Sequence, residues 1–262
     1  MNRIGRRSAL RTGAGAALAG ALTAGCTHPD PAPKPSAAPV VTGSPPVRPG
    51  PDLPAPPPHR FPGLPVEIVH GPRNHPAVAL TFHGQGDPAT ARALLDEAER
   101  AGARITVLAV GTWLDEHPAL ARRILDGGHD LGNHTLRHLD VCSLPEAEAY
   151  AEITGCAQRL RRLTGSIGSW FRPSRARHAT PLVQRLATRA GYPHTLSYDV
   201  DSRDFTAPGA RAVTSTVAAQ VERGSVVSLH FGYADTVAAL PALLDELDRR
   251  GLRAVTTTEL LT

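Results

Sequence analysis

Aromatic residues are scarce in this chain. Phe, Trp and Tyr together make up 4% of its 262 residues. A broad surface of aromatic rings for stacking a ligand is therefore not expected, because such a surface needs several exposed rings. We interpret the two tryptophans, Trp113 and Trp170, as core residues rather than as ligand-binding residues.

An excess of one charge is also lacking once the first 26 residues are set aside. The whole chain has a formal charge of +4, but Arg3, Arg6, Arg7 and Arg11 all lie in that first segment, which has no acidic residue. The rest of the chain has as many basic as acidic residues. This balance gives no reason to expect nucleic acid as a partner.

Residues 1–26 have the pattern of an export signal, and their apolar run is too short and too rich in glycine to predict a membrane-spanning helix. The basic start loosely fits a twin-arginine signal. Residues 22–26, Leu-Thr-Ala-Gly-Cys, resemble a bacterial lipobox, except that Thr23 stands where an apolar residue is usual. We predict an exported protein, either lipid-anchored through Cys26 at the outer face of the cytoplasmic membrane or secreted by an ordinary signal peptide.

Residues 27–63 are rich in proline and small residues and show no apolar period. Such a segment cannot bury enough apolar surface to offset the entropy of ordering it, so we predict a disordered tether. Residues 64–262 remain for one folded domain with a sizeable core.

Cys142 and Cys156 in this domain are predicted to be free thiols. Residues 143–146, Ser-Leu-Pro-Glu, read as a capping box that opens a helix running to about Leu163. A helix rises about 1.5 Å per residue, so the two cysteines would lie beyond the reach of a disulfide.

Short apolar runs alternate with amphipathic stretches through residues 64–262. The expected strands are 78–82, 105–110, 130–132, 169–171, 194–198, 226–229 and 253–255. The expected helices are 89–101, 118–125, 143–163, 181–190, 211–222 and 237–250. This alternation predicts an α/β domain with parallel strands, either an open sheet or a closed βα barrel. No G-x-G-x-x-G opens a helix, which disfavours a dinucleotide-binding sheet.

Polar residues stand just past the ends of five expected strands. They are His83, His134, Arg172, the stretch from Asp199 to Asp204, and His230. The carboxyl-end rim is where catalytic groups gather in βα barrels. Any one of these residues has an ordinary structural explanation, but their recurrence at five strand ends favours a functional site.

His134 and His138 are spaced to bind one metal ion. They belong to residues 132–138, Gly-Asn-His-Thr-Leu-Arg-His. Side chains four residues apart lie on one face of a helix or helix-like turn, and neutral imidazole is a good zinc ligand. The spacing alone is a weak signal in a chain with 12 histidines, so the prediction depends on the other rim residues.

In their order these motifs resemble the polysaccharide deacetylases of carbohydrate esterase family 4, over about residues 66–262. The G-N-H-[ST]-x-x-H motif of that family is present unchanged at 132–138. Its R-P-P-Y motif reads Arg-Pro-Ser-Arg at 172–175, its D-x-x-D-W motif reads Asp-Ser-Arg-Asp-Phe at 201–205, and its L-x-H run reads Val-Val-Ser-Leu-His at 226–230. The resemblance implies a distorted seven-stranded (β/α) barrel.

The first motif departs from the family pattern. The family has T-F-D-D-G, in which the first Asp is the base and the second binds the metal, whereas residues 81–85 read Thr-Phe-His-Gly-Gln. His83 therefore stands at the base position, and Gly84, which has no side chain, at the ligand position. The resemblance therefore predicts the fold, but the altered first motif means that the activity of the family cannot be carried over directly.

For the retained motifs, the resemblance implies hydrolysis of N-acetyl groups with a divalent metal, zinc or cobalt, held by His134 and His138. His230 matches the general acid of the family, and Asp204 matches the carboxylate that orients it. Arg172 matches the residue that pairs with the base.

Three outcomes are open for the altered motif. His83 can be a third zinc ligand, or the domain can bind glycan without hydrolysing it. In the remaining alternative His83 acts as the base, and the metal then has two protein ligands and binds weakly unless Asp87 or Asp199 swings in. We predict a monomeric, metal-dependent deacetylase of a cell-wall or other N-acetylated polysaccharide such as peptidoglycan. A purely structural lipoprotein would leave the rim histidines scattered.

Overall fold

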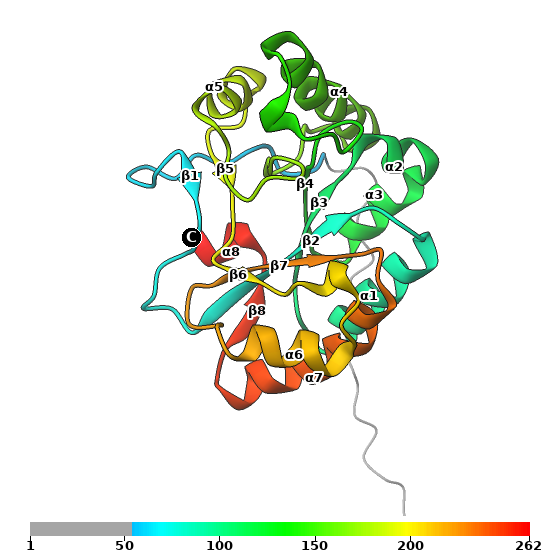
Figure 1. Ribbon diagram of the computed structural model, residues 1–262, viewed down its shortest axis with the longest axis vertical. Coiled ribbons are helices and arrows are strands. Elements are labelled where there is room, and N and C mark those ends of the chain that lie inside the picture. Colours follow the sequence, from blue (N-terminus) through cyan, green and yellow to red (C-terminus); the bar gives the residue numbers. More distant parts are fainter. Residues whose placement is uncertain (1–53) are drawn as a thin grey trace, which may run out of the picture. The chain divides into compact units, whose positions relative to one another are not determined.

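The computed structural model describes residues 54–262 (Figure 1). The predicted export signal, Cys26 and the first part of the predicted tether lie outside the described residues. Among the helices of residues 54–262, none combines the length and the apolar character that a membrane span requires.

The strands of residues 54–262 all pair in parallel. They are β1 (Glu67–Ile68), β2 (Ala77–Gly84), β3 (Thr106–Ala109), β4 (Asp130–Asn133), β5 (Thr195–Leu196), β6 (Val200–Asp201), β7 (Val226–His230) and β8 (Arg253–Val255). The central strand, β2, pairs with β7 on one side and, on the other, with β8 along its first half and β3 along its second half. Almost every β2 residue is buried, as expected for a parallel strand covered on both faces.

The parallel pairs continue round a ring. The strand order is β4-β3-β2-β7-β6, and beyond β4 the ring continues through single bridges, from Asn133 to Phe171 and from Phe171 to Thr195 of β5. Residues 195–201 contain both β5 and β6, so this one stretch leads back to β7. The predicted distorted barrel of parallel strands is confirmed. Each of the seven predicted strands is present, although the one at 169–171 is reduced to the bridging residue Phe171.

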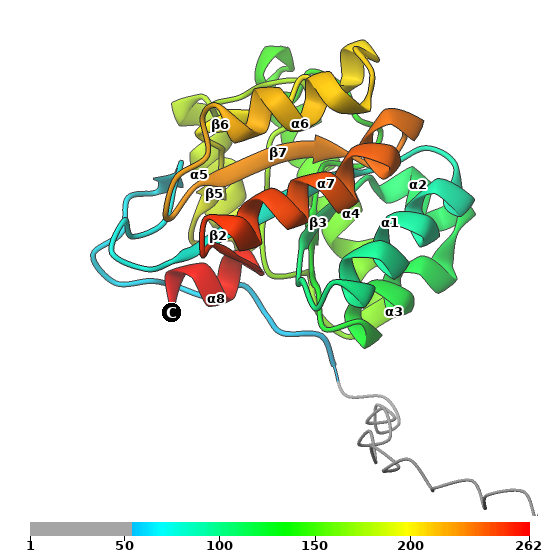
Figure 2. The same cartoon turned by 90° about the horizontal axis from the view of Figure 1, so that it is seen from below.

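Each of the six predicted helices is present; the one at 181–190 has the predicted bounds, and the others differ by a few residues at one or both ends. The helices are α1 (Pro88–Arg100), α2 (Gly111–Glu116), α3 (Pro118–Asp126), α4 (Glu146–Thr164), α5 (Pro181–Ala190), α6 (Ala210–Ala218), α7 (Ala234–Arg249) and α8 (Thr257–Leu261). Helices α1, α2 and α3 gather together beside the strands in both views, and α6 lies along α7 (Figures 1 and 2). Helices α2 and α8 were not predicted, because their 6 and 5 residues are too few to show a helical period.

The predicted capping box before α4 is wrong. Pro145 is the N-cap residue and makes no side-chain capping bond, and the Ser143 hydroxyl donates to Asp140 Oδ2 at 2.6 Å instead. The reason is that Ser143 belongs to a short 3-10 helix (Val141–Ser143), which turns its side chain back along the chain. The free thiols are confirmed: Cys142 is partly exposed, while Cys156 is buried in α4.

The predicted tether ends earlier than residue 63. The Ala55 N–H donates to the carbonyl of Thr164 at 2.8 Å, and Phe61, only 7% exposed, stacks on Trp170 with ring centroids 5.7 Å apart. Residues 54–63 therefore pack on the domain without regular secondary structure. A proline-rich segment can pack in this way when it carries a large apolar side chain, and Phe61 supplies one.

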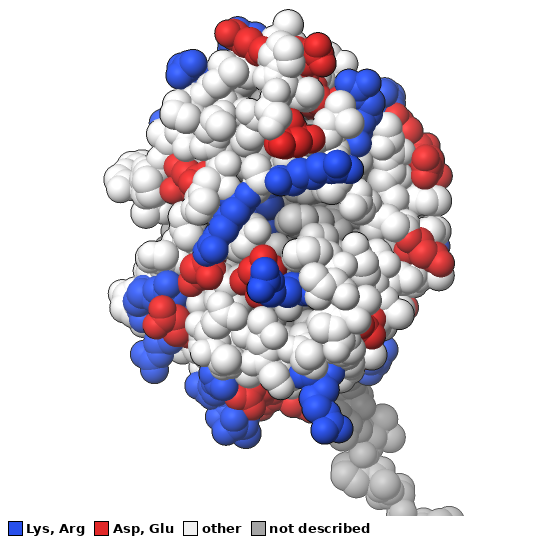
Figure 3. All heavy atoms as spheres, viewed as in Figure 1, with Lys and Arg blue, Asp and Glu red and all other residues white. Residues whose placement is uncertain are grey.

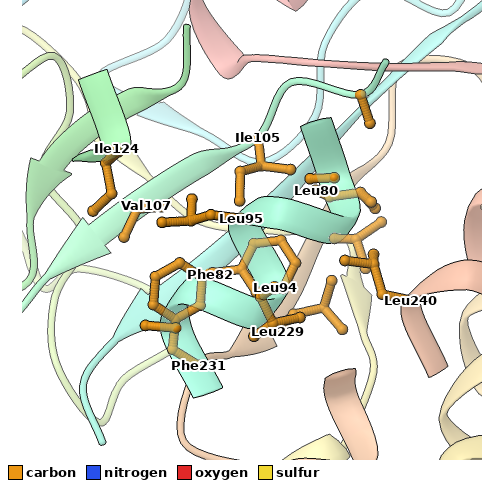
Figure 4. Close-up of a cluster of buried hydrophobic side chains, with 14 of the residues drawn as sticks. Leu80, Phe82, Leu94, Leu95, Ile105, Val107, Ile124, Leu229, Phe231 and Leu240 are labelled. Atoms are coloured by element: carbon orange, nitrogen blue, oxygen red, sulfur yellow. The ribbon is translucent and has the colours of Figure 1, made fainter. Parts of the chain in front are cut away.

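A large apolar core fixes the strands against the helices. Leu80 and Phe82 of β2 pack with Leu94 and Leu95 of α1 (Figure 4), and the ring of Phe82 lies 5.4 Å from that of Phe231. The prediction that both tryptophans are core residues is confirmed, because Trp113 and Trp170 are 4% and 1% exposed. The carboxyl ends of β2, β4 and β7 therefore extend from a well-packed apolar core.

Candidate active site

A pocket of about 360 Å³ lies at the carboxyl ends of the strands. His83 lies near the end of β2, His230 is the last residue of β7, and Asp201 is the last residue of β6. The pocket is lined by His83, Gln85, His138, Arg175, Ala176, Arg177, Tyr198, Asp201, Phe205, Ser228, His230 and Tyr233. The structure therefore brings the predicted rim histidines together, which excludes the scattered arrangement of a purely structural lipoprotein.

His134 has one ring nitrogen without a partner. The side chain is fully buried, and its Nδ1 donates to the carbonyl of Arg172 at 3.0 Å, which leaves the lone pair on Nε2. Among the residues that the structure describes, Nε2 finds no hydrogen-bond partner. A buried acceptor without a partner costs about 1–3 kcal/mol, so this atom is suited to bind a ligand. Metal-binding histidines are commonly oriented by such an Nδ1–H···O=C bond.

His83 and His138 complete a cluster around this nitrogen. One ligand atom from each of His83, His134 and His138 lies within 4.8 Å of the others. Nitrogens on one tetrahedral zinc ion lie about 3.3 Å apart, a spacing that small side-chain rotations can reach. Burial lowers the pKa of His83 and His134 well below the usual value, and burial followed by the Arg175 guanidinium lowers the pKa of His138 to about 4. All three are therefore neutral near pH 7, which is the form that binds metal.

The two histidines of the second motif lie on a loop, so the predicted helix or helix-like turn is wrong. Thr135 and His138 have left-handed backbones, with φ of 67° and 58°. Asn133 holds the loop, because its Oδ1 accepts from the Thr135 N–H at 2.8 Å and its Nδ2 donates to the hydroxyl of Tyr192 at 2.9 Å. Non-glycine residues in this conformation are strained and cluster at functional sites. The ring centroids of His134 and His138 are 5.0 Å apart, so the loop brings the two imidazoles close together, as was expected of a helix.

Arg172 is fully buried under the pocket, and no carboxylate within residues 54–262 contacts it. It donates instead to the carbonyls of Leu196 and Ser197 at 3.0 and 2.9 Å and to Thr81 Oγ1 at 2.8 Å. Its Nη1 also lies 3.3 Å from His83 Nε2. Burial lowers the pKa of this guanidinium to about 9, so it remains charged at neutral pH.

The contact with Arg172 limits the roles open to His83. Arg172 can only donate, so His83 Nε2 accepts, and a metal or a proton has to compete with the guanidinium for that imidazole. Asp87 and Asp199, the residues expected to complete the metal site if His83 acts as the base, both have other partners in this structure. Asp87 accepts from the Ala89 N–H at 2.7 Å as the N-cap of α1, and Asp199 is paired with Arg73 at 2.9 Å. The structure favours the arrangement with His83 as third ligand, because His83 lies in one cluster with His134 and His138.

Gly84 is closed to a side chain by the packing of β2 on β3. A Cβ atom added at Gly84 would lie 2.9 Å from Val107 Cγ1 and 3.1 Å from Ala109 Cα. Both distances are shorter than ordinary contacts. The position at which the T-F-D-D-G pattern has its metal ligand is therefore filled by core atoms rather than left open.

Asp204 and His230 form a pair at the pocket wall. Asp204 is fully buried, and its Oδ1 accepts from His230 Nδ1 at 2.6 Å. Its Oδ2 accepts from the backbone N–H of His230 at 2.8 Å and from the hydroxyl of Thr236 at 2.7 Å. The carboxylate thus fixes the ring so that Nε2 can exchange a proton in the pocket. Sequence reasoning missed Thr236, which lies in α7 and belongs to no motif.

The pocket walls hold aromatic and basic residues that the sequence did not single out. Phe205, 44% exposed, and Tyr233 have ring centroids 5.5 and 5.8 Å from that of His230. Tyr198, Arg175 and Arg177 also line the pocket. Phe205 and Arg175 sit inside quoted motifs, so their positions in those motifs were the signal that could have found them.

Together these features describe a parallel βα barrel with a metal-capable histidine cluster and a His–Asp pair in one pocket. The model of the family "Polysaccharide deacetylase" matches residues 70–194. A peptidoglycan-N-acetylglucosamine deacetylase from Bacillus cereus is 31% identical over 194 aligned residues, 72% of this chain and 90% of that protein. A chitooligosaccharide deacetylase from Bradyrhizobium is 29% identical, over 67% of this chain and 86% of that protein.

A solved structure shares the fold. It is that of a carbohydrate esterase family 4 pseudoenzyme from Bacillus anthracis, with a TM-score of 0.71 and 23% identity, over 76% of this chain and 70% of that chain. A mutant of the same pseudoenzyme has restored enzymatic activity. The chain belongs to the polysaccharide deacetylase family, carbohydrate esterase family 4, whose members are hydrolases acting on carbon–nitrogen bonds.

Proposed function

We propose that this chain is an exported, metal-dependent N-deacetylase of an N-acetylated polysaccharide such as peptidoglycan, acting as a monomer. The observation that carries the proposal is the unpartnered, buried Nε2 of His134, with ligand atoms of His83 and His138 within 4.8 Å. Neutral imidazoles in this number and spacing fit a divalent ion, and zinc is the expected one, with cobalt as the alternative. The names of the relatives support the substrate class.

Different residues of the pocket have different roles in the proposed reaction. A divalent ion held by His134, His138 and His83 would supply polarisation of the acetyl carbonyl and activation of water. His230 takes the proton of the attacking water, and Asp204 stabilises the imidazolium that forms. The same proton passes from His230 to the leaving amine as the carbon–nitrogen bond breaks, which releases acetate and a free amino sugar. Burial keeps His83 neutral, and the Arg172 guanidinium, 3.3 Å from its Nε2, helps to orient the ring.

The proposed export rests on residues 1–26, with their basic start and lipobox-like end. We propose that Cys26 carries the lipid and that residues 27–53 link it to the domain, so that the pocket works outside the cytoplasmic membrane. Fractionation of cells producing the full chain tests this. Wild-type protein is expected in the membrane fraction, and Cys26→Ser in the soluble extracellular fraction.

Metal content and acetate release test the enzymatic proposal. The purified full chain is expected to hold one zinc or cobalt ion by elemental analysis and to release acetate from peptidoglycan or chitin oligomers. His134→Ala is expected to lose both, while His75→Ala, at an exposed histidine outside the pocket, retains both. Absence of bound metal together with absence of acetate release would contradict the proposal.

A second candidate is a glycan-binding protein without hydrolytic activity. The observation that favours it is the altered first motif, in which neither His83 nor Gly84 offers a carboxylate. Binding of an acetylated glycan without acetate release, in protein that is fully loaded with metal, would select this candidate over the deacetylase.

A further inference from the structure

The two ring nitrogens of His83 have different surroundings. Its Nε2 lies 3.3 Å from Arg172 Nη1 and 3.5 Å from the hydroxyl oxygen of Ser228. Its Nδ1 makes no hydrogen bond within residues 54–262, and the side chain lines the pocket. Because Nε2 faces Arg172 and Ser228, Nδ1 is the nitrogen through which His83 can bind a metal ion together with the other two histidines of the cluster.

Metal binding through Nδ1 changes what His83 needs at Nε2. A neutral imidazole carries one N–H group, so when Nδ1 gives its lone pair to a metal, Nε2 carries the hydrogen and becomes a donor. The Arg172 guanidinium cannot accept that hydrogen, because it has donors only. Metal-binding histidines commonly donate their second N–H to a neighbouring acceptor, which orients the ring. His83 therefore requires an acceptor close to Nε2.

Ser228 is placed to be that acceptor. It lies on β7 opposite Thr81 of β2, two residues before His230, which is itself opposite His83. Side chains two residues apart on a strand point to the same face of the sheet, so Ser228 shares the face that carries both histidines. In the described part of the chain, its hydroxyl has no hydrogen-bond partner other than His83 Nε2. The oxygen of Ser228 is therefore available to accept a hydrogen from His83.

The neighbouring polar groups already have partners. Thr81 Oγ1 accepts from Arg172 at 2.8 Å and donates to a backbone carbonyl of β7 at 2.6 Å. The two carboxylate oxygens of Asp204 accept three hydrogen bonds. Figure 3 shows basic side chains around a recess near the middle of the face it presents. The surroundings of His83 thus offer mainly donors and positive charge, and Ser228 supplies the acceptor beside Nε2.

We infer that Ser228 is a positioning residue, whose hydroxyl accepts from His83 Nε2–H while His83 Nδ1 binds the metal. The inference rests on the proposed metal-dependent function. When no metal is bound, the same hydroxyl donates to Nε2, and the hydrogen of the ring stays on Nδ1. The contact is long at 3.5 Å, as polar contacts in active sites often are before the ligand binds. Ser228 occupies the leucine position of the L-x-H run, and a leucine could not accept a hydrogen bond.

The zinc affinity of the full chain, measured by competition with a chelating dye, tests the inference. Ser228→Ala is expected to lower this affinity about tenfold, the lower end of the loss that follows when a group orienting a metal ligand is removed. Ser169→Ala, at a buried serine outside the pocket lining, is the matched control and is expected to bind zinc as wild type does. Both substitutions remove one buried hydroxyl, so their difference reports the contact with His83.

The effect of Ser228 is expected to require His83. In a His83→Ala background, Ser228→Ala has no ligand left to orient, so the zinc affinity is expected to stay that of His83→Ala alone. NMR of the full chain with isotope-labelled histidine locates the hydrogen directly. The His83 signals, assigned by their loss in His83→Ala, are expected to show the hydrogen on Nδ1 without zinc and on Nε2 with zinc.

The outcomes separate this inference from the proposed function. Unchanged zinc affinity in Ser228→Ala, a loss that persists in the His83→Ala background, or zinc bound through His83 Nε2 overturns the inference while the proposed function stands. If the wild-type chain binds neither zinc nor cobalt, the proposed metal dependence fails and the inference fails with it. Zinc binding that depends on Ser228, without release of acetate, supports the inference and contradicts only the deacetylase activity.

Discussion

The two sides of the pocket differ in how their polar groups find partners. On the side built from retained motifs, Asp204 accepts three hydrogen bonds and His134 has its Nδ1 fixed by a backbone carbonyl. On the side of the altered first motif, His83 Nε2 has only longer contacts, at 3.3 Å to Arg172 and 3.5 Å to Ser228. The first side is tightly positioned, and the second is held mainly by packing.

This difference explains how the chain tolerates the loss of two aspartates. A buried arginine without a partner would be costly. Arg172 avoids that cost because two carbonyls and the Thr81 hydroxyl accept its N–H groups. The fold therefore depends little on a carboxylate at position 83, and substitutions on the two sides are expected to differ in what they affect.

The largest effect is expected from His134→Ala on the retained side. It removes the buried nitrogen of the histidine cluster that finds no protein partner within residues 54–262, and changes to groups that only orient a metal ligand already lower metal affinity by about 10–100-fold. We expect a loss of metal affinity of more than about 100-fold, together with loss of acetate release. Competition with a chelating dye measures the affinity, and circular dichroism checks the fold. Metal retained at wild-type affinity would remove His134 from the site.

His230→Asn is expected to separate catalysis from metal binding. The substitution removes the proton carrier but none of the three clustered ligands. We expect turnover to fall by about 10²–10⁴-fold, the usual contribution of a general acid–base, with metal affinity unchanged. Thr236→Val should give a smaller loss, because it removes only one of the three hydrogen bonds to Asp204. Unchanged turnover in His230→Asn would assign the proton transfer to another group.

On the altered side, His83→Ala is expected to weaken metal binding less than His134→Ala does. Arg172 already competes for the His83 imidazole, so we expect a loss of roughly 10–100-fold. The His83→Asp variant gives a contrast, because its carboxylate can pair with Arg172. Dye competition on both variants measures the effect. A loss in His83→Ala as large as in His134→Ala would show that the two sides of the pocket bind the metal equally.

The sequence predicted the alternating strands and helices and the convergence of the rim histidines, because these depend on periodicity and on parallel topology. It could not predict how His134 and His138 meet. Residue spacing suggested a helix, whereas left-handed backbone at Thr135 and His138, held by Asn133, decides the geometry. It also missed Thr236, since this hydroxyl reaches Asp204 only through the packing of α7. A contact between residues far apart in the chain, such as that of Thr236 with Asp204, cannot be predicted from the local sequence pattern.

The smallest effect, and the sharpest test of packing on the altered side, is expected from Gly84→Ala. An added methyl group meets Val107 and Ala109 at 2.9 and 3.1 Å, so we expect a loss of about 1–3 kcal/mol in the free energy of unfolding, measured by urea denaturation. Gly232→Ala is the matched control, because its nearest contact would be an ordinary 3.4 Å. If Gly84→Ala is as stable as wild type, there is room for a side chain at this position. Gly84→Asp could then supply the ligand that the first motif lacks, and the contrast between the two sides of the pocket would come from chemistry alone rather than from packing.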